Sequence, residues 1–100
     1  MSNYNSIRSF YPQIVITKIR DGHYADDSND IWIYSERGAP GGEDQKWSVT
    51  VRPECAYIFS DLITAGTNVV ARNQKLEDAL KLAQLLVMIR NAYMMIDVRP

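Results

Sequence analysis

The stretch NQKLEDALKLAQLLVMIRNAYMMI, residues 73–96, decides the fold. Its apolar residues recur every three or four positions, which is the spacing of one face of an α-helix. The residues on this face are Leu76, Ala79, Leu80, Ala83, Leu86 and Val87. Asn73 is the expected N-cap, and Glu77 and Asp78 would lie near the positive end of the helix dipole. The pattern predicts a long C-terminal helix over about residues 74–96, with this face against the core.

Apolar residues cover more of this helix than one packing face requires. They include Leu82, Leu85, Ile89, Tyr93 and Ile96, and even the polar edge contains Met88 and Met95. Two interpretations stay open: strands of the same monomer cradle the helix, or Met88, Ile89 and Met95 form a dimer face, because methionine adapts to irregular surfaces. A membrane role is not expected, since a span needs about 20 mostly apolar residues and the unbroken run 85–89 ends at Arg90.

Composition limits the classes of protein that fit. The chain has 100 residues, of which 46% are hydrophobic, and a net charge of −1. These values predict one domain over residues 1–100, with residues 1–12 as a flexible polar lead-in. The charge removes the electrostatic case for nonspecific nucleic-acid binding. A single cysteine, Cys55, and the lack of an N-terminal signal pattern predict a reducing, cytoplasmic location.

Three segments have the composition of β-strands. QIVITKIR at 13–20 is rich in β-branched residues, and IWIY at 31–34 is apolar on both faces. In KWSVTVR at 46–52, apolar and polar residues alternate, which predicts one buried face and one wet face. The first two strands would form a hairpin closed by a long acidic loop, residues 21–30.

Residues 55–71 are ambiguous. They fit one or two short strands, at residues 56–59 and 68–71, or a short helix before Gly66; strands are favoured. The whole pattern predicts an α+β fold, in which a three- to four-stranded antiparallel sheet packs on one long C-terminal helix as a two-layer sandwich.

No catalytic, cofactor or metal site is expected. The aspartates of the acidic loop fail the EF-hand spacing, because the glycine position counted from Asp26 holds Ile31 and the final glutamate position holds Arg37. His23 is the only histidine and has no nucleophile near it in sequence. Loops on a rigid sheet often carry binding residues, so the loops are the expected partner-binding sites. The residues concerned are Asp26, Asp27, Asp30 and Arg37.

Trp32 and Tyr34 form a second candidate site. If they lie on the sheet face opposite the helix, they make an aromatic platform for a protein hot spot or for single-stranded nucleic acid. The net negative charge favours the protein version.

In size, acidity and strand-then-helix layout, the whole chain resembles small soluble proteins of phages and mobile elements, including anti-CRISPR and other anti-defence inhibitors. No family motif carries the resemblance, so it assigns no functional residue. It implies a noncatalytic protein that binds a host nucleoprotein defence complex stoichiometrically, in the host cytoplasm. The alternative function is a small nucleic-acid-binding domain that uses the aromatic sheet face.

Overall fold

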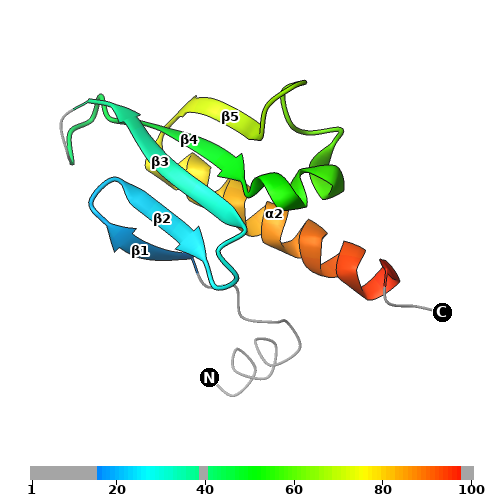
Figure 1. The fold of residues 1–100 in the computed structure, drawn as a ribbon. Coiled ribbons are helices and arrows are strands. Elements are labelled where there is room, and N and C mark those ends of the chain that lie inside the picture. Colours follow the sequence, from blue (N-terminus) through cyan, green and yellow to red (C-terminus); the bar gives the residue numbers. More distant parts are fainter. Residues whose placement is uncertain (1–15, 39–40, 98–100) are drawn as a thin grey trace, which may run out of the picture.

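The computed structural model describes residues 16–38 and 41–97, so the predicted lead-in at residues 1–12 and residues 13–15 of the first predicted strand lie outside the described part. In the described part, five antiparallel strands form one sheet in the order β1-β2-β3-β4-β5 (Figure 1). The strands are β1 (Ile16–Arg20), β2 (His23–Asp26), β3 (Ile31–Arg37), β4 (Lys46–Val51) and β5 (Val69–Gln74). A 3₁₀-helix, η1 (Pro53–Phe59), follows β4, and the long helix α2 (Leu76–Asp97) follows β5. The predicted α+β fold is confirmed, with five strands instead of three or four.

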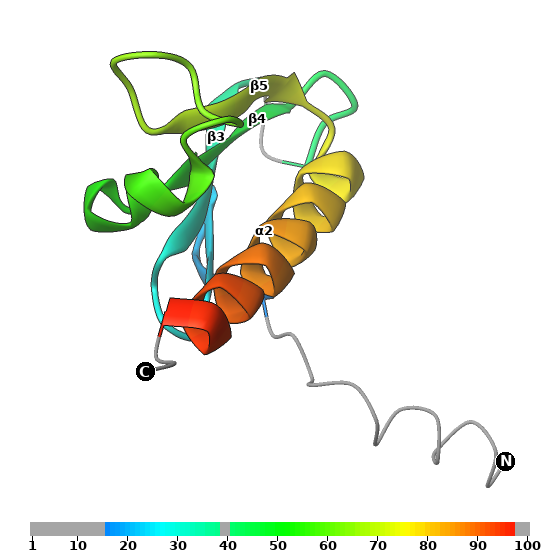
Figure 2. The same cartoon turned by 90° about the vertical axis from the view of Figure 1, so that its right-hand side faces the viewer.

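The sheet and α2 form two layers (Figure 2). Helix α2 packs on β1, β3 and β4 and so covers one face of the sheet, and no helix of the described residues covers the other face (Figure 2). The core lies between the layers and combines sheet, η1 and α2. Its buried residues are Ile31, Ile33, Trp47, Val49, Val51, Cys55, Phe59, Ala79, Ala83, Leu86 and Val87.

The acidic segment is not one long loop. It contains β2, which pairs with both β1 and β3. Gly22 and Asn29 have positive φ values, 80° and 58°, and provide the tight turns on the two sides of β2. The sequence His-Tyr-Ala-Asp has no β-branched residue and no clear alternation, so strand patterns give no signal there.

A third turn requires a glycine. Gly38 follows β3 with φ at 94°, and a Cβ atom built on it would lie 2.5 Å from Cα of Gln45. A side chain at residue 38 would therefore collide with the backbone that leads into β4.

The ambiguous segment is partly helical. Residues 56–59 belong to η1, so the strand predicted there is wrong. Pro53 lies in the first turn of η1, which suits its fixed φ, and Cys55 and Phe59 are the two residues of this helix that are buried in the core. The strand predicted at residues 68–71 is confirmed as part of β5.

The start of the long helix differs from the prediction. Asn73 is a residue of β5 with φ at 61°, and its backbone N–H donates to Glu36 Oε2 at 2.8 Å. Asn73 is therefore not the N-cap, and α2 begins at Leu76. The predicted inner face is confirmed: Ala79, Ala83, Leu86 and Val87 are buried, and Leu76 and Leu80 pack beside them.

Over Leu76–Ile96, α2 is long enough and apolar enough to cross a membrane by length and composition, with a mean hydropathy of 1.3. Mostly buried core helices of soluble proteins meet the same criterion, and 28% of this window is buried inside the fold. In this fold the inner face of α2 packs on the sheet, and its Arg90 is bonded to two aspartates next to β2 and β3. The helix is therefore an integral part of the sandwich.

Candidate protein-binding face

The face of the sheet that α2 leaves open is formed by alternating residues of β2, β3 and β4. Cross-strand partners lie on the same face, and the register pairs His23 with Tyr34 and Ala25 with Trp32 on one side of β3. On the other side, Tyr34 is paired with Ser48 and Trp32 with Thr50. We call these six residues, His23, Ala25, Trp32, Tyr34, Ser48 and Thr50, the open face.

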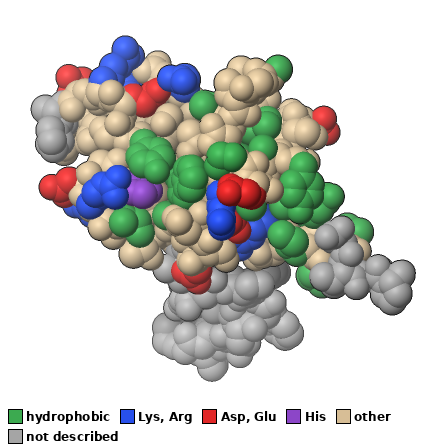
Figure 3. Space-filling view, in the orientation of Figure 1, with side chains coloured by type: hydrophobic (Ala, Val, Ile, Leu, Met, Phe, Trp, Pro, Cys, Tyr) green, Lys and Arg blue, Asp and Glu red, His purple; other side chains and the backbone are tan. Residues whose placement is uncertain are grey.

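Aromatic rings lie at the middle of the open face, and Figure 3 shows apolar side chains gathered there beside the histidine. The rings of His23 and Tyr34 are stacked, with centroids 4.3 Å apart, and Trp32 meets Tyr34 edge to face at 6.2 Å. The indole Nε1 of Trp32 donates to both the backbone oxygen and Oδ1 of Asn29, each at 2.9 Å. Trp32 and Tyr34 are half-buried, so the contacts fix both rings while part of each stays exposed.

The alternation of β4 predicts a wet outer face, but Ser48 is buried and Thr50 is half-buried. The cause is the neighbouring strand, because the aromatic side chains of Tyr34 and Trp32 lie directly opposite them. Trp32 and Tyr34 lie on the sheet face opposite the helix. This is the position that an aromatic platform requires.

The open face also contains buried polar atoms that have no hydrogen bond. Among the described residues, these atoms are both ring nitrogens of His23 and Oγ1 of Thr50. Unpaired buried polar groups cost free energy and are rare in native structures.

The pKa of His23 lies below its ordinary value of 6.5, first because burial disfavours the charged ring and second because the charge of Arg20 is close. Below pH 6.5 the unfolded chain therefore binds a proton more readily than the folded chain does. We expect the free energy of unfolding to be constant near neutral pH and to fall as the pH drops below 6.5.

Urea unfolding of the wild type and of His23→Phe across this pH range measures the effect. Phenylalanine keeps a ring beside Tyr34 but cannot titrate, so its stability should fall less steeply. Equal slopes for the two proteins would contradict the assignment.

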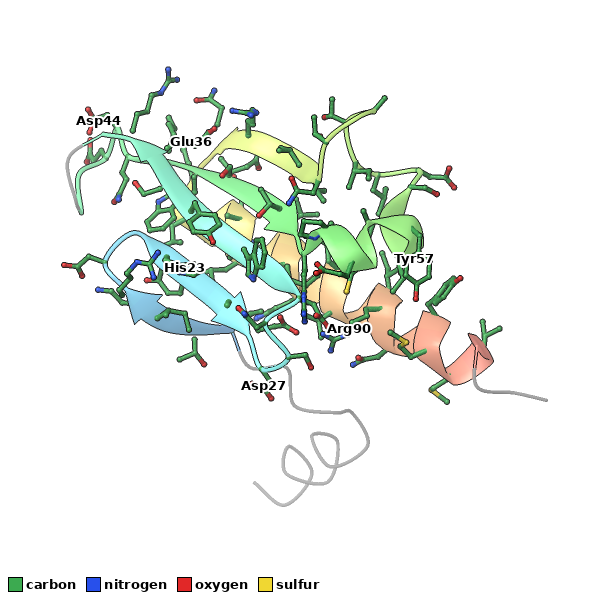
Figure 4. The ribbon with its side chains drawn as sticks, viewed as in Figure 1. His23, Asp27, Glu36, Asp44, Tyr57 and Arg90 are labelled. Atoms are coloured by element: carbon green, nitrogen blue, oxygen red, sulfur yellow. The ribbon has the colours of Figure 1, made fainter. Side chains whose placement is uncertain are left out.

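The three aspartates predicted to bind a partner have different surroundings. Asp26 is buried, and its Oδ1 accepts from the backbone N–H groups of Asp30 and Ile31 at 2.8 and 2.9 Å. Its Oδ2 accepts from Nη1 of Arg90 at 2.6 Å, and the same nitrogen donates to Asp30 Oδ2 at 2.9 Å. Figure 4 shows Arg90 on α2 beside this end of the sheet. Asp26 thus has no surface to offer a partner, because its burial and hydrogen bonds tie the turn to the helix.

The other predicted loop residues differ in exposure and are spread over the fold. Asp27 is exposed at the turn before β3, whereas Arg37 ends β3 and donates from Nη2 to Asn73 Oδ1 at 2.7 Å. They therefore lie at opposite ends of the same strand. Asp30 is half-buried and is also 3.6 Å from Nη1 of Arg52. The structure does not gather these residues into one site.

The three residues predicted to form a dimer face also differ in their exposure. Met88 and Met95 are exposed, whereas Ile89 packs against the core. Ile89 therefore belongs to the inner side of α2.

The described residues offer little for catalysis. In residues 16–38 and 41–97, no group of three His, Cys, Asp or Glu side chains is placed to hold a metal ion. Cys55 is buried, and burial together with nearby Asp30 raises the pKa of its thiol, which keeps it protonated and weakly nucleophilic. An open hollow of about 590 Å³ lies between the loop before β4 and the start of α2, lined by Gly41, Gly42, Glu43, Gln45, Trp47, Lys75 and Leu76. It contains no nucleophile beside a base.

No protein-family model, curated protein or solved structure matches this chain.

Proposed function

We propose that the chain is a noncatalytic protein-binding module that uses its open face to occupy a surface on a larger partner. The observation that carries this proposal is the fixed pair of half-exposed rings, Trp32 and Tyr34, on the sheet face that α2 does not cover. Tryptophan and tyrosine are the residues most enriched at binding hot spots. Rings already held in place lose little conformational entropy on binding.

The charges around the open face suit a protein partner better than a nucleic acid. Two arginines flank the open face. Arg20 lies opposite His23, and Arg52 is 3.6 Å from Asp30 and 3.4 Å from Glu54, so the charge of Arg52 is already partly compensated. The chain as a whole has a net charge of −1. Nucleic-acid binding draws most of its affinity from lysine and arginine that displace counterions. Aromatic anchors with a mixed-charge rim are typical of protein interfaces.

Such a face supports inhibition by stoichiometric occlusion of a partner's surface. The described residues provide aromatic anchors for binding, and no catalytic group of nucleophile, acid and base is found among them. The resemblance to small phage and mobile-element inhibitors makes a host defence complex one candidate partner. Capture of the chain's partner from cells that encode it, with a photo-crosslinking residue at Thr17, tests this. Thr17 is exposed and lies opposite Ala25 on the open face. A crosslinking residue at exposed Asp61, after η1, is the matched control.

We expect Trp32→Ala to weaken binding to the captured partner by about 30-fold or more, the effect of losing a hot spot of about 2 kcal/mol. Tyr57→Ala is the control, because Tyr57 is an exposed aromatic residue on η1 instead of the open face. Calorimetric titration of purified components measures both affinities, and circular dichroism checks that both variants fold.

Equal affinities for the two variants would remove the open face from the binding site. Salt-sensitive binding to a single-stranded oligonucleotide that Trp32→Ala abolishes would assign the face to nucleic acid instead.

A further inference from the structure

The outer side of α2 contains a row of apolar residues, Leu85, Met88, Ala92 and Met95, which we call the outer stripe. Its spacings of three, four and three residues place all four on one side of the helix and match the a and d positions of a heptad. Leu85, Met88 and Met95 are 50, 55 and 67% exposed, and Ala92 is exposed as well. This is the pattern of a helix that packs against another helix.

No described strand covers the outer stripe. The inner face of α2, with Ala83, Leu86 and Val87, already packs on the sheet, and the outer stripe lies on the opposite side of the helix. Figure 1 shows the C-terminal turns of α2 passing beyond the ends of the strands. The outer stripe is therefore available to a second molecule.

The outer stripe contains no charge. Arg90 is the only charged residue between residues 84 and 96, and it is directed inward to Asp26 and Asp30. The residues that flank the outer stripe, Gln84, Asn91 and Ile96, are neutral, and exposed Lys81 lies one turn before Leu85 on the same side of the helix. An uncharged surface meets its own copy without like-charge repulsion, whereas a charged partner would find no complementary charge there. It also lacks the lysine and arginine residues with which surface helices bind anionic lipid.

We propose that the outer stripe pairs with the outer stripe of a second copy of this chain, in antiparallel orientation. With the two-fold axis beside residue 90, Leu85 of each copy meets Met95 of the other, and Met88 meets Ala92. Each long side chain at the centre then faces a small one, so the two helices can approach closely. A two-fold axis requires such a self-complementary surface.

The area that the outer stripe can bury indicates how stable the proposed dimer is. A large apolar side chain presents about 200 Å² when fully exposed, so the outer stripe with Ile96 offers roughly 500 Å² per copy. The pair would bury about 1,000 Å² in total, near the lower limit for a specific interface. The dimer therefore dissociates on dilution.

Light scattering coupled to size exclusion tests the proposal on the full chain, from low micromolar to millimolar concentration. The mass should rise from 11.4 kDa toward twice that value. Met88→Asp should keep the chain monomeric, with at least a 100-fold weaker dimer, because it buries an unpaired charge at the centre. Ile19→Asp is the control: Ile19 is 53% exposed and belongs to β1 instead of α2, and this variant should dimerise normally.

A monomer at every concentration would overturn the proposal, as would equal dimerisation of Met88→Asp and the wild type. Orientation is tested by mixing Leu85→Cys with Met95→Cys under oxidising conditions. The antiparallel pair predicts a disulfide between the two variants, whereas disulfides that form only within each variant would overturn it.

This inference does not depend on the proposed function. Trp32 lies on the opposite side of the sandwich from the outer stripe, so Met88→Asp tests only the dimer and Trp32→Ala tests only the open face. If both hold, each dimer presents two open faces, and a partner with two copies of its surface would be bound more tightly by the dimer than by Met88→Asp.

Discussion

Replacing Arg90 with methionine should lower the free energy of unfolding by about 3–5 kcal/mol, the usual cost of removing one partner from a buried ion pair. Arg90 Nη1 lies 2.6 Å from Asp26 and 2.9 Å from Asp30. Methionine fills much of the same volume but leaves Asp26 without its cation, whereas Asp30 keeps Arg52 at 3.6 Å. Asp26, which is buried, bears most of this cost, because its charge cannot reach water.

Urea unfolding followed by circular dichroism measures this loss. Arg72→Met is the matched control, since Arg72 contacts Glu36 at 3.2 Å but is itself 70% exposed in its side chain. An exposed pair of this kind contributes about 0–1 kcal/mol. If the two substitutions destabilise the chain equally, the cluster of Arg90, Asp26 and Asp30 does not hold the helix to the sheet.

Replacing Phe59 with alanine should cost a similar amount, about 3–5 kcal/mol, through lost burial and the cavity left behind. Phe59 is 1% exposed and joins η1 to the core formed by the sheet and α2. The loss should appear as a lower urea midpoint with an unchanged denaturant slope.

Tyr57→Ala serves as the control for this substitution as well. Tyr57 lies two residues earlier in η1, is 57% exposed and meets Tyr93 of α2 edge to face at 5.6 Å. It therefore removes an aromatic ring from the same helix without opening a core cavity. An equal loss for the two variants would show that η1 is held by its surface contacts and not by Phe59.

The periodic parts of the fold were predictable from the sequence. The spacing of Ala79, Ala83 and Leu86 identifies both α2 and its inner face, and the alternation of Trp47, Val49 and Val51 identifies β4 and its core side. These patterns exist because the regular geometry of a helix or strand fixes the side of the element to which each side chain points. The four residues of β2 show no such pattern, so the sequence predicts a loop there. The continuous apolar run at residues 55–59 of η1 fits a strand as well as a helix, so periodicity does not separate the two.

The polar contacts were not predictable in the same way. Asp26 and Arg90 are separated by 64 residues, and nothing local distinguishes Asp26 from its exposed neighbour Asp27. Similarly, Asn73 has the residue type of an N-cap, but its backbone N–H bonds to Glu36 on a distant strand. The aromatic platform was predictable only conditionally, because the sequence shows that Trp32 and Tyr34 share a face but not which face the helix covers.

The simple strand order has a consequence for how the chain folds during synthesis. Each strand pairs with the next one along the chain, so the sheet is built from contacts local in sequence that can form quickly. The ribosome completes all five strands before it makes α2, and until then the apolar side of Ile33 and Val49 has no cover. The nascent sheet is thus the stage most exposed to aggregation, and the arrival of α2, locked by Arg90, ends that exposure.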